Sequence, residues 1–266
     1  MSVLTQEKLD QAEAILRGSN VDAWLLFVRE SSDGGDAALP LLVEGAFVWQ
    51  SAFLFTPAGH RVAIVGSYDA EPLSKCPEWT EVIPYVEGIG DPLARTLDRI
   101  VPGDVHHPRL AVNYSLNDDK ADGLSHGMFL LLEGYLKGTR FERSMVSAEQ
   151  IVGALRSRKT EEELRRIQAA IADTELIFRE IERIARPGLS ERALYHEAQK
   201  LVRERGLGFA WDSAANPIVN SGPDSSIGHA APSDRITIAP GHILHVDLGV
   251  VKELYSSDMQ RCWYVA

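Results

Sequence analysis

The sequence predicts an α/β domain followed by an α+β domain, with the boundary near residue 145. In residues 1–145, apolar runs of strand length alternate with segments of helical spacing, and this interleaving is typical of an open layered α/β fold. In residues 146–266, two long amphipathic helices precede a group of strands, which is typical of an α+β layer. A chain of 266 residues is long enough for both domains.

The first domain is expected to contain both helices and strands. A helix is expected over 5–16, because Thr5 can cap its start and Gly18 can end it. Asp91 and Pro92 open a second helix, and residues 118–136 are expected to be mostly helical. The expected strands are apolar runs bounded by turn residues, and they cover 22–28, 46–55, 61–66, 81–86 and 109–113.

The second domain begins with two helices whose ends are marked by capping residues. Thr160 and Glu163 form a capping-box pattern at the start of a helix over 160–185. Ser190 caps the next helix, over 190–205, and Gly206 ends it. Strands are then expected over 209–215, 243–250 and 255–265.

The last two strands read as a β-hairpin with Lys252 and Glu253 in its turn. This turn places Asp247 opposite Asp258. Because side chains alternate along a strand, the hairpin has a polar face and a core face. The polar face carries His245, Asp247, Gly249, Ser256, Asp258 and Gln260. The core face carries Leu244, Val246, Leu248, Val250, Tyr255, Met259 and Trp263.

Two opposed carboxylates favour a divalent cation. Like charges directly across a ladder are destabilising, and a hard metal ion held between Asp247 and Asp258 would remove the repulsion. The alternative is two independently solvated aspartates. Lys-Glu is a poor tight turn, and a register shift by one residue would send one carboxylate to the other face.

The segment around this hairpin resembles a known family. The run GHAAPSDRITIAPGHILHVDLGVVKELYSSDMQRCWYV combines a His before a polar-Pro-Asp segment, a Gly ahead of a strand, Asp-x-Gly and Tyr-Ser-x-Asp-x-x-Arg. It resembles the active-site core of the aminopeptidase P, prolidase and creatinase family, the pita-bread metallohydrolases. The resemblance is strongest over 207–266, and it implies that the second domain has the pita-bread fold.

The resemblance also implies roles for individual residues. Asp247 and Asp258 match two carboxylates that bind a dinuclear metal centre, with Mn²⁺ expected and Co²⁺ or Zn²⁺ as alternatives. His229 matches a histidine of the substrate pocket and is the expected catalytic residue. Tyr255, Arg261 and His245 are candidates for supporting the metal ligands. The family completes its site with a further His and two Glu after this hairpin, whereas this sequence ends at Ala266, so we expect the catalytic domain to be incomplete.

Composition excludes several kinds of partner. The net charge of −11 argues against nucleic acid and anionic membrane surfaces, since both need a basic footprint. The two cysteines, Cys76 and Cys262, are too few for a disulfide framework and suit a reducing cytosol. No apolar run approaches the length of a membrane span. The family resemblance adds a homodimer as the expected assembly.

The expected function is hydrolysis of the peptide bond before proline, as an aminopeptidase or a dipeptidase acting on proline-containing peptides. Two alternatives keep the same fold: a creatinase-like hydrolase of a non-peptide C–N bond, and a binding module without catalysis. Because Asp247 and Asp258 cannot saturate two metal ions, we expect the 266-residue chain alone to be inactive or weakly active.

Overall fold

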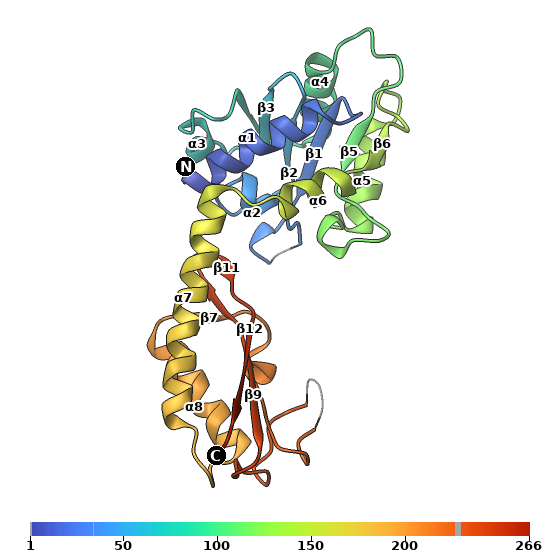
Figure 1. Ribbon diagram of the computed structural model, residues 1–266. Helices are drawn as coiled ribbons and strands as arrows, with labels where there is room; N and C mark the ends of the chain where they lie inside the picture. The colour runs from blue at the N-terminus through green and yellow to red at the C-terminus, as the bar shows by residue number, and fades with distance from the viewer. Residues whose placement is uncertain (1, 34, 227–229) are drawn as a thin grey trace. The chain divides into compact units, whose positions relative to one another are not determined.

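The chain divides into two compact units, Met1–Thr160 and Glu161–Ala266 (Figure 1). The computed structural model describes residues 2–33, 35–226 and 230–266. Each unit has its own hydrophobic core. Among the helices of these ranges, none is long and apolar enough to cross a membrane.

A mixed six-stranded sheet in the order β4-β3-β2-β1-β5-β6 organises the first unit. The strands β1, β2 and β3 pair antiparallel, whereas β4, β5 and β6 join by parallel pairing. The strands are β1 (Ala23–Val28), β2 (Ser51–Phe55), β3 (Arg61–Gly66), β4 (Glu81–Tyr85), β5 (Leu110–Val112) and β6 (Met145–Ser147).

Helices cover both faces of this sheet, so the central strand is buried on both sides. All six residues of β1 are buried. Trp24, Leu26 and Val28 point to the core beneath α1 and α6, and Leu25 and Phe27 point to the core beneath α4 and α5. This arrangement confirms the predicted α/β class. The helices are α1 (Val3–Arg17), α2 (Leu39–Leu42), α3 (Ala70–Ser74), α4 (Gly90–Ile100), α5 (His126–Leu136) and α6 (Glu149–Ser157).

The first unit differs from its sequence-based description in three places. It runs to Thr160 rather than ending near 145, because β6 pairs with β5 and α6 packs into the same core. The strand expected over 46–55 begins at Ser51. The helix expected over 118–136 is broken into a 3₁₀ turn, Asp119–Ala121, and α5, whose start is capped by the Ser125 side chain.

The second unit packs two helices against short antiparallel sheets, which confirms the predicted α+β layer. One sheet has the order β12-β9-β8 and the other β11-β10-β7. The elements are α7 (Glu161–Ile184), α8 (Glu191–Glu204), β7 (Gly208–Phe209), β8 (Ile218–Ser221), β9 (Ile243–Leu248), β10 (Val250–Lys252), β11 (Tyr255–Ser256) and β12 (Met259–Tyr264).

The helices of the second unit follow the sequence pattern closely. The Ser190 hydroxyl accepts the Ala193 N–H and caps α8, as predicted. Ile177 and Ile181 of α7 lie in the core with Val246 of β9. The strand expected over 209–215 is shorter than predicted, because the chain turns into a 3₁₀ helix at Ser213–Ala215.

Candidate metal centre

The hairpin that carries the two aspartates has a different register from the one predicted. Asp247 of β9 pairs with Gln260 of β12, not with Asp258. The turn residues are Glu253 and Leu254 rather than Lys252 and Glu253. Both have positive φ, 49° and 71°, which is the pattern of a type I′ turn. Moving the turn by one residue moves each pairing partner by two.

A shift of two residues leaves the faces of the hairpin unchanged, because side chains alternate with a period of two. The Ser257 hydroxyl lies 2.6 Å from the Thr174 hydroxyl of α7, so Ser257 faces the helices. Its neighbour Asp258 therefore faces the opposite side, and its side chain is exposed. Asp247 and Asp258 share one face as diagonal neighbours rather than as a directly opposed pair.

We call this side of the hairpin the open face; it carries His245, Asp247, Ser256, Asp258 and Gln260. At its far end, Ile243 is 52% exposed and Tyr264 69% exposed. The other side is buried against α7 and α8 through Leu244, Val246 and Leu248, which confirms the predicted core face. The hairpin thus holds both carboxylates on the face away from the helices, with Asp247 partly buried and Asp258 exposed, while its apolar side fixes its position on the helices.

A chain of polar side chains orients Asp247 on the open face. The Gln260 amide donates to Oδ2 of Asp247 at 3.0 Å. Since the amide group donates there, Oε1 of Gln260 faces Nε2 of His245, at 3.1 Å. Nδ1 of His245 lies 3.3 Å from Oδ1 of Asn220 on β8. Both ring nitrogens of His245 therefore face side-chain oxygens, so the ring is held from both sides.

Through this series of hydrogen-bonded side chains, His245 acts on the Asp247 carboxylate indirectly. His245 was expected beside Asp247, and the structure places it on the same face with Gln260 between the two. The bridging role of Gln260 and the contribution of Asn220 were not predicted. Gln260 belonged to the predicted polar face, but which side chain it contacts follows from the register, which the sequence pattern did not determine.

Tyr255 and Arg261, the other two candidates for supporting the metal ligands, lie on the side of the hairpin that faces α7. The Tyr255 hydroxyl donates to Oε1 of Glu163 on α7 at 2.9 Å. The Arg261 guanidinium lies 3.8 Å from the Glu175 carboxylate and 5.7 Å from the centre of the Phe178 ring. Odd-numbered positions of this strand point toward the helices, so both side chains brace the hairpin against α7.

His229, the expected catalytic residue, lies outside the described residues. Residues on both sides of it in the sequence are held by Glu191 of α8, whose side chain is 2% exposed. Its Oε1 accepts the Ser221 N–H at 2.8 Å and the Ser225 hydroxyl at 2.6 Å, and its Oε2 accepts the Ser233 N–H at 3.0 Å. Sequence reasoning missed this carboxylate. The available signal was an acidic residue directly after the capping Ser190.

Asp247 and Asp258 suit a hard divalent cation, because both offer carboxylate oxygens on the same face of the hairpin. Across residues 2–33, 35–226 and 230–266, no group of three or more His, Cys, Asp or Glu side chains is placed to hold a metal ion. The two aspartates therefore fit as part of a coordination sphere, and further donors would be needed to complete it.

Comparison with known proteins shows that this region is similar in sequence to metallopeptidases. Residues 165–266 match the sequence model of metallopeptidase family M24. The uncharacterized peptidase YqhT of Bacillus subtilis (strain 168) is 32% identical over 120 residues, which are 45% of this chain and 33% of that protein. An Xaa-Pro dipeptidase of Lactobacillus delbrueckii subsp. lactis is 23% identical over 79% of this chain and 56% of its own length.

Solved structures show the same fold over almost the whole chain. An Xaa-Pro dipeptidase from Bacillus anthracis aligns with a TM-score of 0.67 at 20% identity, over 98% of this chain and 65% of that one. An X-Pro aminopeptidase from Thermotoga maritima MSB8 aligns with a TM-score of 0.66 at 22% identity, over 95% and 64%. The chain thus spans less than two thirds of these proteins, consistent with an incomplete pita-bread domain. The match of residues 165–266 to the M24 model agrees with the family resemblance of the hairpin motifs.

Proposed function

We propose that this chain is part of a metal-dependent peptidase that cleaves the bond before proline. The observation that carries the proposal is the placement of Asp247 and Asp258 on one open face, within the region that matches the M24 family. The Xaa-Pro dipeptidase and X-Pro aminopeptidase that share the fold favour this substrate class over other peptides.

In this proposal the two aspartates hold a pair of divalent cations, with Mn²⁺ preferred and Co²⁺ or Zn²⁺ as alternatives. When bound, such a pair would lower the pKa of a shared water and polarise the scissile carbonyl. Gln260 fixes the orientation of the Asp247 carboxylate, and His245 holds Gln260. His229 would contact the substrate, as the family resemblance implies.

We further propose that the 266-residue chain alone has little activity, because the described residues supply only two carboxylates to a site that needs more donors. The first unit would then be the N-terminal domain that accompanies the catalytic one. A cytoplasmic location and a homodimeric assembly remain part of the proposal.

The test measures proline release from Xaa-Pro dipeptides and longer Xaa-Pro peptides with Mn²⁺ added. It compares the 266-residue chain with any longer native form, and it includes Asp247→Asn and Asp258→Asn. Glu182→Gln is the matched control, because Glu182 is exposed on α7 and makes no ion pair with a described residue. We expect activity in the longer form alone, abolished by either aspartate substitution and unchanged by the control.

A second readout separates metal binding from turnover. Mn²⁺ titration followed by electron paramagnetic resonance should show that Asp247→Asn and Asp258→Asn each weaken binding to the 266-residue chain. Metal binding without peptide cleavage, together with turnover of creatine, would favour a creatinase-like hydrolase. No metal binding and no turnover in any form would favour a binding module and would refute the peptidase proposal.

A further inference from the structure

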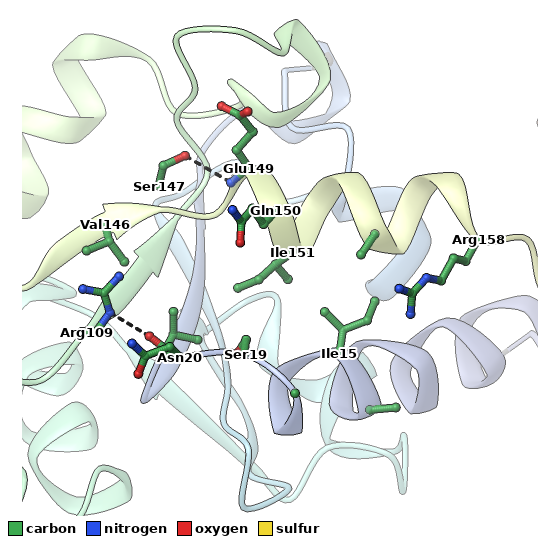
Figure 2. A pocket seen from close by; sticks show the side chains of 14 residues that line it. Ile15, Ser19, Asn20, Arg109, Val146, Ser147, Glu149, Gln150, Ile151 and Arg158 are labelled. Atoms are coloured by element: carbon green, nitrogen blue, oxygen red, sulfur yellow. Dashed lines mark hydrogen bonds between the residues drawn. The ribbon is translucent and has the colours of Figure 1, made fainter.

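The first unit contains a cleft that the proposed peptidase chemistry does not use. It lies between the C-terminal end of α1, the length of α6 and the neighbouring strand β6 (Figure 2). Its volume is about 880 Å³, and small-molecule sites commonly have volumes of about 300–1,000 Å³. We call it the α1–α6 cleft. All of its lining residues, from Ala14 to Arg158, belong to the first unit.

The floor of the α1–α6 cleft is apolar. Ile15, Val21 and Val146 line it and pack on the buried core of the first unit, to which Ile151 also belongs. These side chains offer a surface that an apolar ligand could cover, and covering apolar surface contributes roughly 25 cal/mol per Å² removed from water.

Two guanidinium groups, those of Arg109 and Arg158, line the same cleft. Figure 2 shows them on opposite sides of it, with Arg158 directed inward from the end of α6. Nε of Arg109 donates to the Asn20 carbonyl at 2.7 Å, which helps to fix the side chain. Both arginines are exposed, so a ligand in the cleft can reach their guanidinium groups.

The charge of the cleft contrasts with that of the chain. Its lining includes two arginines and one acidic residue, Glu149, whose carboxylate accepts the Ser115 hydroxyl. The chain as a whole carries a net charge of −11. A locally cationic cleft with an apolar floor suits a ligand that has an anionic head and an apolar body, because guanidinium groups recognise carboxylates through charge-assisted hydrogen bonds.

We propose that the α1–α6 cleft binds an organic anion, a carboxylate carried on an apolar chain. The apolar body lies over Ile15, Val21 and Val146, and the carboxylate contacts a guanidinium at the rim. This site is independent of the candidate metal centre, so its test does not depend on the peptidase proposal.

Isothermal titration calorimetry of the full chain with sodium octanoate tests the proposal. We expect one saturable site. One of the two substitutions Arg109→Gln and Arg158→Gln, the one that removes the guanidinium in contact with the carboxylate, should weaken binding about five- to tenfold, as expected for the loss of a partly exposed charge-assisted contact. Ala154→Leu, which adds volume to the cleft lining, should weaken binding as well. Arg95→Gln is the matched control, because Arg95 is exposed on α4 outside the cleft.

Two further probes separate the parts of the ligand. Inorganic phosphate carries charge without an apolar body, and octylamine carries the body with the opposite charge; neither should bind at the concentrations at which octanoate saturates. Binding of phosphate equal to that of octanoate would overturn the proposal, as would equal weakening by the Arg95 control and the two cleft arginines. Absence of saturable octanoate binding to the folded chain would overturn it directly. Circular dichroism checks that each variant is folded. If Ala154→Leu does not fold, the substitutions of the exposed Arg109 and Arg158 still test the proposal.

Discussion

Glu191 is a buried side chain that accepts hydrogen bonds from the end of β8 and from residues between β8 and β9. Its carboxylate is 2% exposed and accepts two backbone N–H groups and one hydroxyl, from Ser221, Ser233 and Ser225. Hydrogen bonds to a charged group contribute about 1.5–3 kcal/mol each, and a buried donor left without an acceptor costs about 1–3 kcal/mol. Glu191→Ala removes the acceptor from all three donors. Since Ser221 is buried and Ser233 half-buried, we expect a loss of about 3–5 kcal/mol in the free energy of unfolding.

Glu191→Gln distinguishes the loss of acceptors from the loss of volume. The amide keeps the shape of the side chain but has one oxygen, so one of its ends presents N–H groups to a backbone donor. If the oxygen stays with Ser221 and Ser225, the amide nitrogen faces the Ser233 N–H. We therefore expect an intermediate loss of about 1–3 kcal/mol.

Urea unfolding followed by circular dichroism measures these differences. Hydrogen exchange of the backbone amides of Ser221 and Ser233 reports on the same contacts locally. The matched control is Glu197→Gln, on the exposed side of the same helix, and it should change stability by less than about 0.5 kcal/mol. The reasoning is refuted if Glu191→Ala behaves like this control, or if exchange at Ser221 and Ser233 does not accelerate.

Three other predictions concern single positions. Gly249→Ala should destabilise the chain by about 1–3 kcal/mol in urea unfolding, because a Cβ there would lie 2.4 Å from the Trp211 ring and 2.6 Å from the Ser257 carbonyl; wild-type stability would contradict this. Leu254→Gly should stabilise the hairpin by about 0.5–1 kcal/mol, since Leu254 is 76% exposed and has a φ of 71°, and a lower unfolding midpoint would contradict it. Burial raises the pKa of the Asp36 carboxyl, so its ionisation disfavours the folded state as pH rises above the unfolded pKa of about 3.9. The stability of the wild type relative to Asp36→Asn should therefore increase as pH falls from neutral toward that value, whereas a constant difference across urea titrations at several pH values would refute the assignment.

The parts of the fold that the sequence predicted are those in which periodicity and caps agree. The helix expected over 160–185 is α7, within one residue at each end. The Ser190 hydroxyl caps α8, as predicted. The short β6 and the helix α6 were missed as parts of the first unit. A three-residue strand carries little pattern, and its place in the sheet comes from pairing with β5, a contact that is distant in sequence.

The candidate site, like the fold, could be predicted from the sequence only in part. Alternation predicted which side chains share a face, and the structure keeps Asp247 and Asp258 together on the open face even though the register differs. The polar contacts of Gln260 could not be predicted without the register. The hydrogen bonds of Glu191 come from Ser221 and Ser233, which are distant from it in sequence. Local sequence patterns do not predict such long-range contacts.

The position of the turn explains why the register was wrong. Glu253 and Leu254 both adopt positive φ, which costs roughly 1–2 kcal/mol for each residue that is not glycine, so sequence preference gave no reason to place the turn there. Tertiary contacts offset part of this cost. The Arg165 guanidinium lies 2.6 Å from the Glu253 carboxylate, and Arg166 donates to the Glu253 carbonyl at 3.2 Å. Because α7 holds the turn from outside the hairpin, α7 helps to set the register, and the register determines that Gln260, rather than Asp258, stands opposite Asp247.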